Sequence, residues 1–215
     1  YEDLDESVRG LDRFGEQAHD IISSPTTRKA FDLSLEKPAE ATRFGRHEFG
    51  QSLLLASRLI ESGVHFVTVR LRPAEFDFDT HTDNFSRLSN LLPPFDKGLA
   101  SLIDRLKERG LFSSTAIMVA GEFGRTPKVN NQGGRDHWAR AMFALMAGGD
   151  VRGGQAIGET DKLAGEPNGS GYSPEDIAAS FFQNIGISPQ KEFQTNVGRP
   201  INLVRDGQPI KQLFS

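Results

Sequence analysis

The sequence contains no cysteine among its 215 residues. This absence excludes disulfide bridges, thiolate metal sites and thiol nucleophiles, so any metal ion must be bound by histidine, aspartate or glutamate. No apolar run approaches the length that a membrane-spanning helix needs. Basic residues number 25 against 29 acidic ones and are interspersed with them, which argues against a nucleic-acid partner.

Several common catalytic signatures are also missing. The sequence has no G-x-S-x-G elbow, no P-loop and no G-x-G-x-x-G after a strand, which argues against an α/β-hydrolase, a P-loop NTPase and a dinucleotide enzyme. It begins at Tyr1 without an initiator methionine or a signal-like segment, so we expect a part of a longer protein. The length predicts a single domain over residues 1–215.

The hydrophobic pattern predicts helices and strands in alternation. The polar stretch from Ser34 to Arg43 is expected to be a loop. Helices are expected over residues 4–22, 26–32 and 49–61, in the segment 84–110 from Pro93 and Pro94 onward, and from the N-cap Ser173 to Gly186; strands are expected over 64–71, 116–120 and 141–147, with a short one within 151–161.

The segment from Val64 to Gly121 has the pattern of a strand, a helix and a second strand. Such a crossover makes the two strands parallel, with both carboxyl ends at one edge of the sheet. The second strand, residues 116–120, is apolar throughout and is expected to be buried on both faces. The predicted fold class is therefore α/β, with a mostly parallel or mixed sheet sandwiched by helices.

Charged and titratable residues follow each of these two strands. Asp79 and His81 lie in the acidic segment RPAEFDFDTHTDNF, and their two-residue spacing can direct both side chains at one ion. Glu122 and His137 follow the second strand. Because both segments start at the same predicted sheet edge, we expect them to converge.

Three interpretations remain open for the group after the second strand, which comprises Glu122, Arg125, Asp136 and His137. An ion pair between Glu122 and Arg125 would simply hold a loop. Arg125 and the backbone amides around it could instead bind phosphate or sulfate, for which a guanidinium is suited. Glu122 and His137, together with the Asp79 and His81 pair, could ligate a divalent ion such as Zn²⁺, Mn²⁺ or Ca²⁺. The second and third interpretations are compatible.

The motifs DTHTDNF, LPPFDKGLASLIDRLKERGLFSSTAIMVAGEFGRTP, GRDHW, AGGDVRGGQAIGETD and SPEDIAASFFQNIGI occur in this order. Together they resemble the carboxyl-terminal half of the domain of unknown function 1501 family, sulfatase-like proteins grouped with the alkaline phosphatase superfamily. The resemblance extends from about residue 31 to residue 214. It implies an alkaline phosphatase-like fold whose amino-terminal half, with the nucleophile, is missing from this chain.

The resemblance also implies a dinuclear metal site. Asp79 and His81 would supply the first pair of ligands, Glu122 would stand where a later aspartate is usual, and His137 would be the last histidine, beside Asp136. Two features depart from the family pattern. A phenylalanine follows Glu122 where a ligating histidine is usual, and Asp77, four residues before His81, competes with Asp79.

The activity implied by the resemblance is hydrolysis of phosphate or sulfate esters of a small molecule or glycan. The metal would most simply be zinc, with manganese, calcium and magnesium as alternatives, and Arg125 would be a catalytic residue that stabilises the oxyanion. The family resemblance implies a periplasmic or extracellular location. A non-catalytic secreted or cell-surface binding protein with a degenerate metal or anion site is the rival interpretation.

Overall fold

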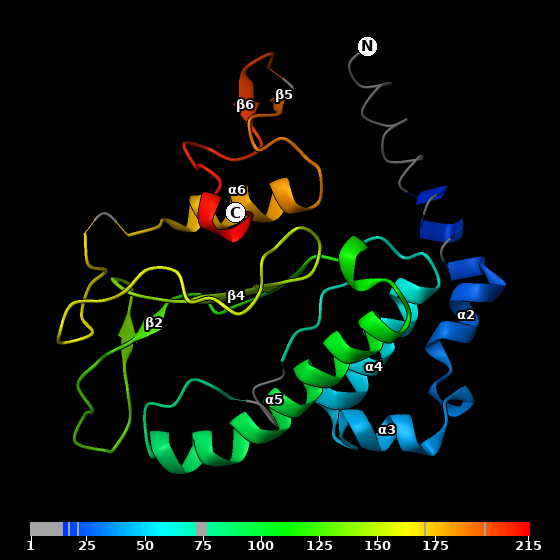
Figure 1. The fold of residues 1–215 in the computed structure, drawn as a ribbon, viewed down its shortest axis with the longest axis horizontal. Helices are drawn as coiled ribbons and strands as arrows, with labels where there is room; N and C mark the ends of the chain where they lie inside the picture. The colour runs from blue at the N-terminus through cyan, green and yellow to red at the C-terminus, as the bar shows by residue number, and fades with distance from the viewer. Residues whose placement is uncertain (1–14, 17, 21, 72–76, 170, 196) are drawn as a thin grey trace. The chain divides into compact units, whose positions relative to one another are not determined.

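The computed structural model describes residues 15–16, 18–20, 22–71, 77–169, 171–195 and 197–215 (Figure 1). The helix predicted over residues 4–22 lies largely outside these residues. The described residues form two compact units. Unit 1 takes its residues from 1–77 and 90–109, and unit 2 from 78–89 and 110–215. This division does not decide between one domain and two, so the single domain stays a prediction.

Unit 1 is built from helices (Figure 1). Its core consists of apolar side chains of α4 and α5 together with Ala30 and Phe44, and Phe49 stacks on Phe95 with ring centroids 5.5 Å apart. Helix α4 packs against α2 and α3. The elements are α2 (Pro25–Phe31), η1 (Leu33–Leu35), α3 (Pro38–Phe44), α4 (Glu48–Glu61) and, from Asn90 onward, α5 (Asn84–Glu108).

Helix α4 confirms the predicted helix and its glycine cap. Gly63 adopts a left-handed φ of 91°, which glycine tolerates at little cost. Its amide donates to Ile60 O at 3.0 Å, and the amide of Val64 donates to Leu59 O at 3.0 Å. These two bonds satisfy carbonyl groups that the end of a helix leaves free.

Three predictions for this part of the chain were wrong. The expected loop over residues 34–43 contains η1 and α3, because Pro38 at the start of α3 has its φ fixed near the helical value. Helix α5 begins at Asn84 and continues through both prolines. Residues 64–71 form no strand in the structure. Without a neighbouring strand, their backbone groups have no ladder to join.

Unit 2 contains three antiparallel strand pairs and no parallel pair among its described residues. The expectation of a mostly parallel sheet, and of a crossover from residue 64 to 121, was therefore wrong; the described fold is α/β with helices and small antiparallel sheets. The pairs are β1 (Ile117–Ala120) with β4 (Ala144–Ala147), β2 (Gly124–Arg125) with β3 (His137–Trp138), and β5 (Glu192–Gln194) with β6 (Pro200–Asn202).

The β1–β4 pair is more exposed than its sequence suggests. Side chains along β1 alternate between half-buried and exposed positions, so the expectation of burial on both faces was wrong. Residues 151–161 form no strand, and the described part of the chain there has an isolated bridge between Thr160 and Pro167. The short helices η2 (Phe112–Ser114) and η3 (Lys211–Leu213) complete the unit with α6 (Pro174–Asn184).

Helix α6 forms as predicted. Ser173 is its N-cap and forms a capping box with Asp176, in which each side chain accepts a hydrogen bond from the other residue's backbone amide. At the other end Asn184 binds the turn after β4, through Gly148 O at 3.2 Å and the Asp150 amide at 2.9 Å. No described helix combines the length and apolarity needed to span a membrane.

Candidate metal centre

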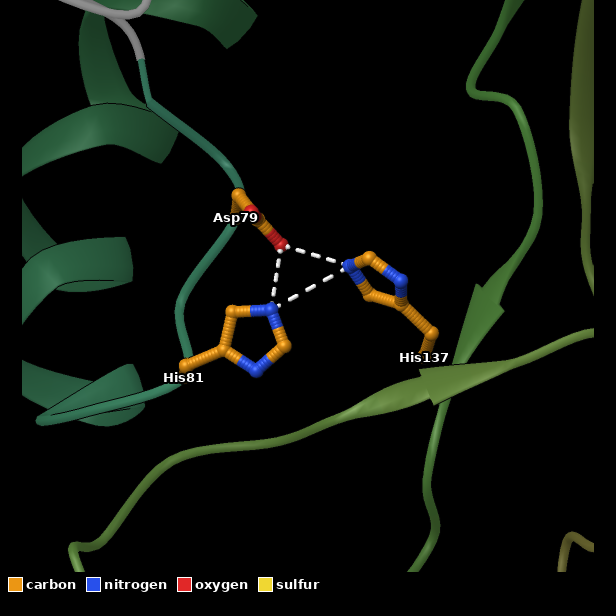
Figure 2. Close-up of side chains that lie close together, drawn as sticks. All are labelled: Asp79, His81 and His137. Carbon is orange, nitrogen blue, oxygen red and sulfur yellow. Dashed lines mark hydrogen bonds and ion pairs between the residues drawn. The ribbon is translucent and has the colours of Figure 1, made fainter.

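Three potential metal ligands meet within unit 2 (Figure 2). Asp79 and His81 come from the segment before α5, and His137 is the first residue of β3. Nε2 of His81 lies 2.9 Å from Oδ1 of Asp79 and 3.2 Å from Nε2 of His137, which is itself 3.0 Å from the same carboxylate oxygen. The three donor atoms therefore form a nearly equilateral triangle, which we call the triad.

Protons alone do not satisfy these three contacts. The carboxylate carries none, and each imidazole nitrogen of the triad carries at most one. If one nitrogen donates to both other atoms, two lone pairs still face each other at the remaining contact. If both nitrogens donate to Asp79, two N–H groups face each other across 3.2 Å. A cation bound by all three atoms satisfies every contact at once.

The dimensions of the triad also fit a metal ion. Metal–ligand bonds of about 2.0–2.1 Å in tetrahedral geometry place ligand atoms about 3.3 Å apart. The observed separations of 2.9–3.2 Å need only a small expansion. The side chains are between 42% and 51% exposed, so the remaining coordination positions face solvent. Three protein ligands with an open position are typical of catalytic rather than structural zinc sites.

Backbone hydrogen bonds join the two segments that carry the triad. The Arg135 amide donates to Thr80 O at 2.9 Å, and the Asn84 amide donates to Gly133 O at 2.9 Å. Thr80, between the two ligands of its segment, is 1% exposed, and its hydroxyl donates to Oδ1 of Asn84 at 2.6 Å. The convergence of the triad therefore follows from direct pairing of these segments.

Gly134 permits this close approach. A Cβ atom at this position would lie 1.8 Å from the carbonyl oxygen of His81 and 2.4 Å from the amide nitrogen of Thr82. Both are backbone atoms, so no rotation of a side chain could relieve the clash. A side chain at position 134 is therefore incompatible with the observed position of His81.

Arg125 lies beside the triad because of the β2–β3 register, which pairs it with His137. One guanidinium nitrogen donates to Oδ1 of Asp79, and the other lies 3.5 Å from Oε1 of Glu122. Hydrogen bonds from His137 and Arg125 lower the pKa of Asp79 to about 2, so this carboxylate is ionised at neutral pH. Phe123 packs against His137, with ring centroids 4.4 Å apart.

Asp136 binds the opposite edge of the His81 ring. Nδ1–H of His81 donates to its Oδ1 at 2.9 Å, and Asn130 donates to the same oxygen at 3.1 Å. These hydrogen bonds lower the pKa of Asp136. With the proton held on Nδ1, Nε2 of His81 is the ring nitrogen that faces the triad and can bind a cation. Carboxylates often orient metal-binding histidines in this way.

The structure thus brings together Asp79, His81 and His137 from the predicted ligand set. The Glu122 carboxylate lies at Arg125 and Asp136 lies behind His81, so neither belongs to the triad. Among the described residues, Asp79 rather than Asp77 contributes to it. Sequence analysis missed Asn130 and Gly134, although their place in a glycine-containing turn, NNQGG, directly before Arg135 was a usable signal.

A protein-family model described as "Protein of unknown function (DUF1501)" matches residues 2–214. The chain belongs to the DUF1501 family. The match includes every residue of the triad and of its supporting loop, while its description assigns no activity to DUF1501 proteins. Neither a curated protein nor a solved structure matches the chain.

Proposed function

We propose that this DUF1501 protein binds a divalent metal ion at Asp79, His81 and His137 and hydrolyses a phosphate or sulfate ester there. The observation that carries the proposal is the triangle of three donor atoms, whose contacts a cation satisfies and protons do not. A guanidinium beside this triangle adds a group suited to a tetrahedral anion.

The donor set favours a borderline metal ion. Two imidazoles and one carboxylate suit Zn²⁺, Mn²⁺ or Fe²⁺, whereas Ca²⁺ and Mg²⁺ prefer sites built from oxygen atoms. Among the metals that the sequence left open, zinc and manganese are therefore preferred over calcium and magnesium. Such an ion would polarise an ester oxygen and lower the pKa of coordinated water.

Arg125 would hold the anionic part of the substrate. Its side chain is 20% exposed, and Asp79 fixes one of its nitrogens next to the ligand atoms. Among the described residues, the other nitrogen is bonded to Glu122 at a long 3.5 Å, and an oxygen of phosphate or sulfate could replace this bond. In this role Glu122 orients Arg125 in the absence of substrate.

The same features favour one ion rather than two. The guanidinium of Arg125 already occupies a position on Asp79 Oδ1 that a second cation would have to share. Phe123, which stands where the family resemblance suggests a ligating histidine, packs its ring against His137 and offers no donor atom. We therefore expect a stoichiometry of one metal ion per chain.

The half-exposed ligands favour a second candidate function. A site open to solvent can hold a metal ion and an anion without turnover, as in a secreted or cell-surface binding protein. Both candidates include the periplasmic or extracellular location that the resemblance implies, and a small-molecule or glycan ester as the hydrolase substrate. They share metal binding and differ in ester hydrolysis.

Metal binding is tested by calorimetric titration of the chelator-treated chain with Zn²⁺ and Mn²⁺. We expect one site, and His137→Ala should weaken binding by more than the about 10- to 100-fold typical of losing a residue that only supports a ligand. His65→Ala, which changes an exposed histidine in unit 1, is the matched control. Equal affinity in both variants would reject the triad as the metal site.

Hydrolysis is tested separately with aryl phosphate and aryl sulfate substrates. The hydrolase proposal predicts that the phenol is released from one of these esters. This release should require added metal, stop when a chelator is added and be lost in His137→Ala. Metal binding without hydrolysis of either substrate would favour the binding function.

A further inference from the structure

The loop between β2 and β3 contains an asparagine whose side chain bonds to the backbone of His81 and to the carboxylate that contacts the His81 ring. We propose that Asn130 is a positioning residue, which holds Asp136 and the backbone of His81 so that Nε2 of His81 faces the metal. The inference rests on the proposed metal binding.

The amide group of Asn130 uses all of its hydrogen-bonding capacity. Its Nδ2 donates to the carbonyl oxygen of His81 at 3.0 Å and to Oδ1 of Asp136 at 3.1 Å. Its Oδ1 accepts from the backbone amides of Gln132 and Gly134, both at 2.9 Å. These four partners leave one orientation, because a flipped amide would face two donors with its nitrogen and two acceptors with its oxygen.

The two bonds from Nδ2 close a ring of contacts around His81. One holds the backbone of the histidine, and the other holds the carboxylate that accepts from Nδ1 of its ring. Asn130 thereby fixes the position of the main chain and the acceptor for the side chain together. A rotation of the imidazole away from Asp79 would break the bond to Asp136.

A purely structural role for Asn130 makes a different prediction. The bonds to Gln132 and Gly134 shape the loop, and they use only the side-chain oxygen. The bonds that reach His81 and Asp136 use only the nitrogen. A variant that keeps the oxygen and loses the nitrogen therefore separates shaping of the loop from positioning of the ligand.

Asn130→Asp is such a variant. Its carboxylate retains an oxygen for the two loop amides, loses both donors and faces Asp136 with like charge. Asn131→Asp, at the exposed neighbouring position, adds the same charge to the same loop and is the matched control. Added negative charge alone would strengthen cation binding. A loss of affinity in Asn130→Asp therefore reports displacement of the ligand.

The affinity for Zn²⁺ is measured on the full chain by competition with a chromophoric chelator. We expect Asn130→Asp to bind about 10- to 100-fold more weakly than the wild type, and Asn131→Asp to bind equally or slightly more tightly. The visible absorption of bound Co²⁺ should change in shape for Asn130→Asp alone, because the geometry of the ligands is altered. Unchanged affinity and spectrum in Asn130→Asp would overturn the inference.

A second pair of variants covers the case in which Asn130→Asp does not fold. Asn130→Ala should weaken Zn²⁺ binding at least about tenfold in the wild type and much less in Asp136→Ala, because residues that act through one another show non-additive effects. Equal effects in both backgrounds would overturn the inference. If the wild type itself binds no metal, the proposed function fails as well, so the two failures are distinguishable.

Discussion

At the scale of single residues, the metal centre depends on a backbone contact as much as on its ligands. Gly134 lies against the main chain of His81 and Thr82, in a space that no other residue type can occupy without moving one of the two segments. The position of a ligand is therefore encoded partly in a residue that offers no donor atom to the metal.

We predict that Gly134→Ala destabilises the protein by about 1–3 kcal/mol or more, because the added methyl group overlaps backbone atoms. Zn²⁺ affinity should also fall at least about tenfold, since relief of the clash displaces His81. Urea unfolding and metal titration measure the two effects. Gly153→Ala is the control, because a Cβ atom there meets nothing within 4 Å. Wild-type metal affinity in Gly134→Ala would contradict the role assigned to this close contact.

At the scale of elements, local signals predicted helices better than they predicted strand pairing. Helices α4 and α6 could be recognised from their caps and glycine ends, which act within a few residues of sequence. The start of α5 could not, because it lies before the prolines, where the amides of Asp83 and Asn84 donate to the distant carbonyl groups of Gln132 and Gly133. Tertiary contacts of this kind override local preference.

The convergence of the triad was predicted for a reason that proved wrong. A parallel crossover was expected to bring Asp79 and His81 to His137, yet residues 64–71 form no strand. The contact instead arises from backbone hydrogen bonds between residues 80–84 and 132–135. Sequence spacing identified which residue types could share an ion, but it could not identify this pairing, which depends on Gly134 and Asn130.

The capping box of α6 provides a test at the scale of one element. Backbone hydrogen bonds from Gln208 and Ser173 lower the pKa of Asp176 below its usual 3.8. A carboxylate with a lowered pKa in the folded state contributes stability above its unfolded pKa and loses it as the pH falls through the folded value. The contribution of Asp176 should therefore be present at pH 7 and decline progressively as the pH falls below about 4.

We predict that Asp176→Asn lowers the stability by about 1 kcal/mol at pH 7, a magnitude typical of a helix cap. The difference from the wild type should shrink as the pH falls below 3.8, because the carboxylate of the folded protein then becomes protonated. Urea unfolding between pH 3 and pH 7 measures it. Glu175→Gln, which removes a neighbouring charge from the same first helical turn, is the control. A difference that does not change with pH would contradict the assigned cause.

At the scale of the whole molecule, the two compact units differ in where their charged groups lie. The triad of unit 2 is half-exposed, whereas Arg105 in unit 1 is 2% exposed and surrounded by carboxylates. It bonds to Glu61 at 2.6 Å, to Glu36 at 2.9 Å and to Glu40 at 3.3 Å. Removing one partner from a buried ion pair typically costs about 3–5 kcal/mol, because it leaves the other charge uncompensated.

We predict that Arg105→Met destabilises unit 1 by about 3 kcal/mol at pH 7 and leaves Zn²⁺ affinity unchanged, since every residue of the triad belongs to unit 2. The hydrogen bond from Arg105 lowers the pKa of Glu36 below 4.5, so the stability linked to this carboxylate is present above that pH and is lost as the pH falls. The penalty should therefore be smaller at pH 3 than at pH 7.

Arg109→Met, which removes a 55% exposed arginine that also faces Glu61, is the control and should cost less than about 1 kcal/mol. Hydrogen exchange resolves the loss to unit 1, and equal penalties for the two arginines would contradict the central role of Arg105.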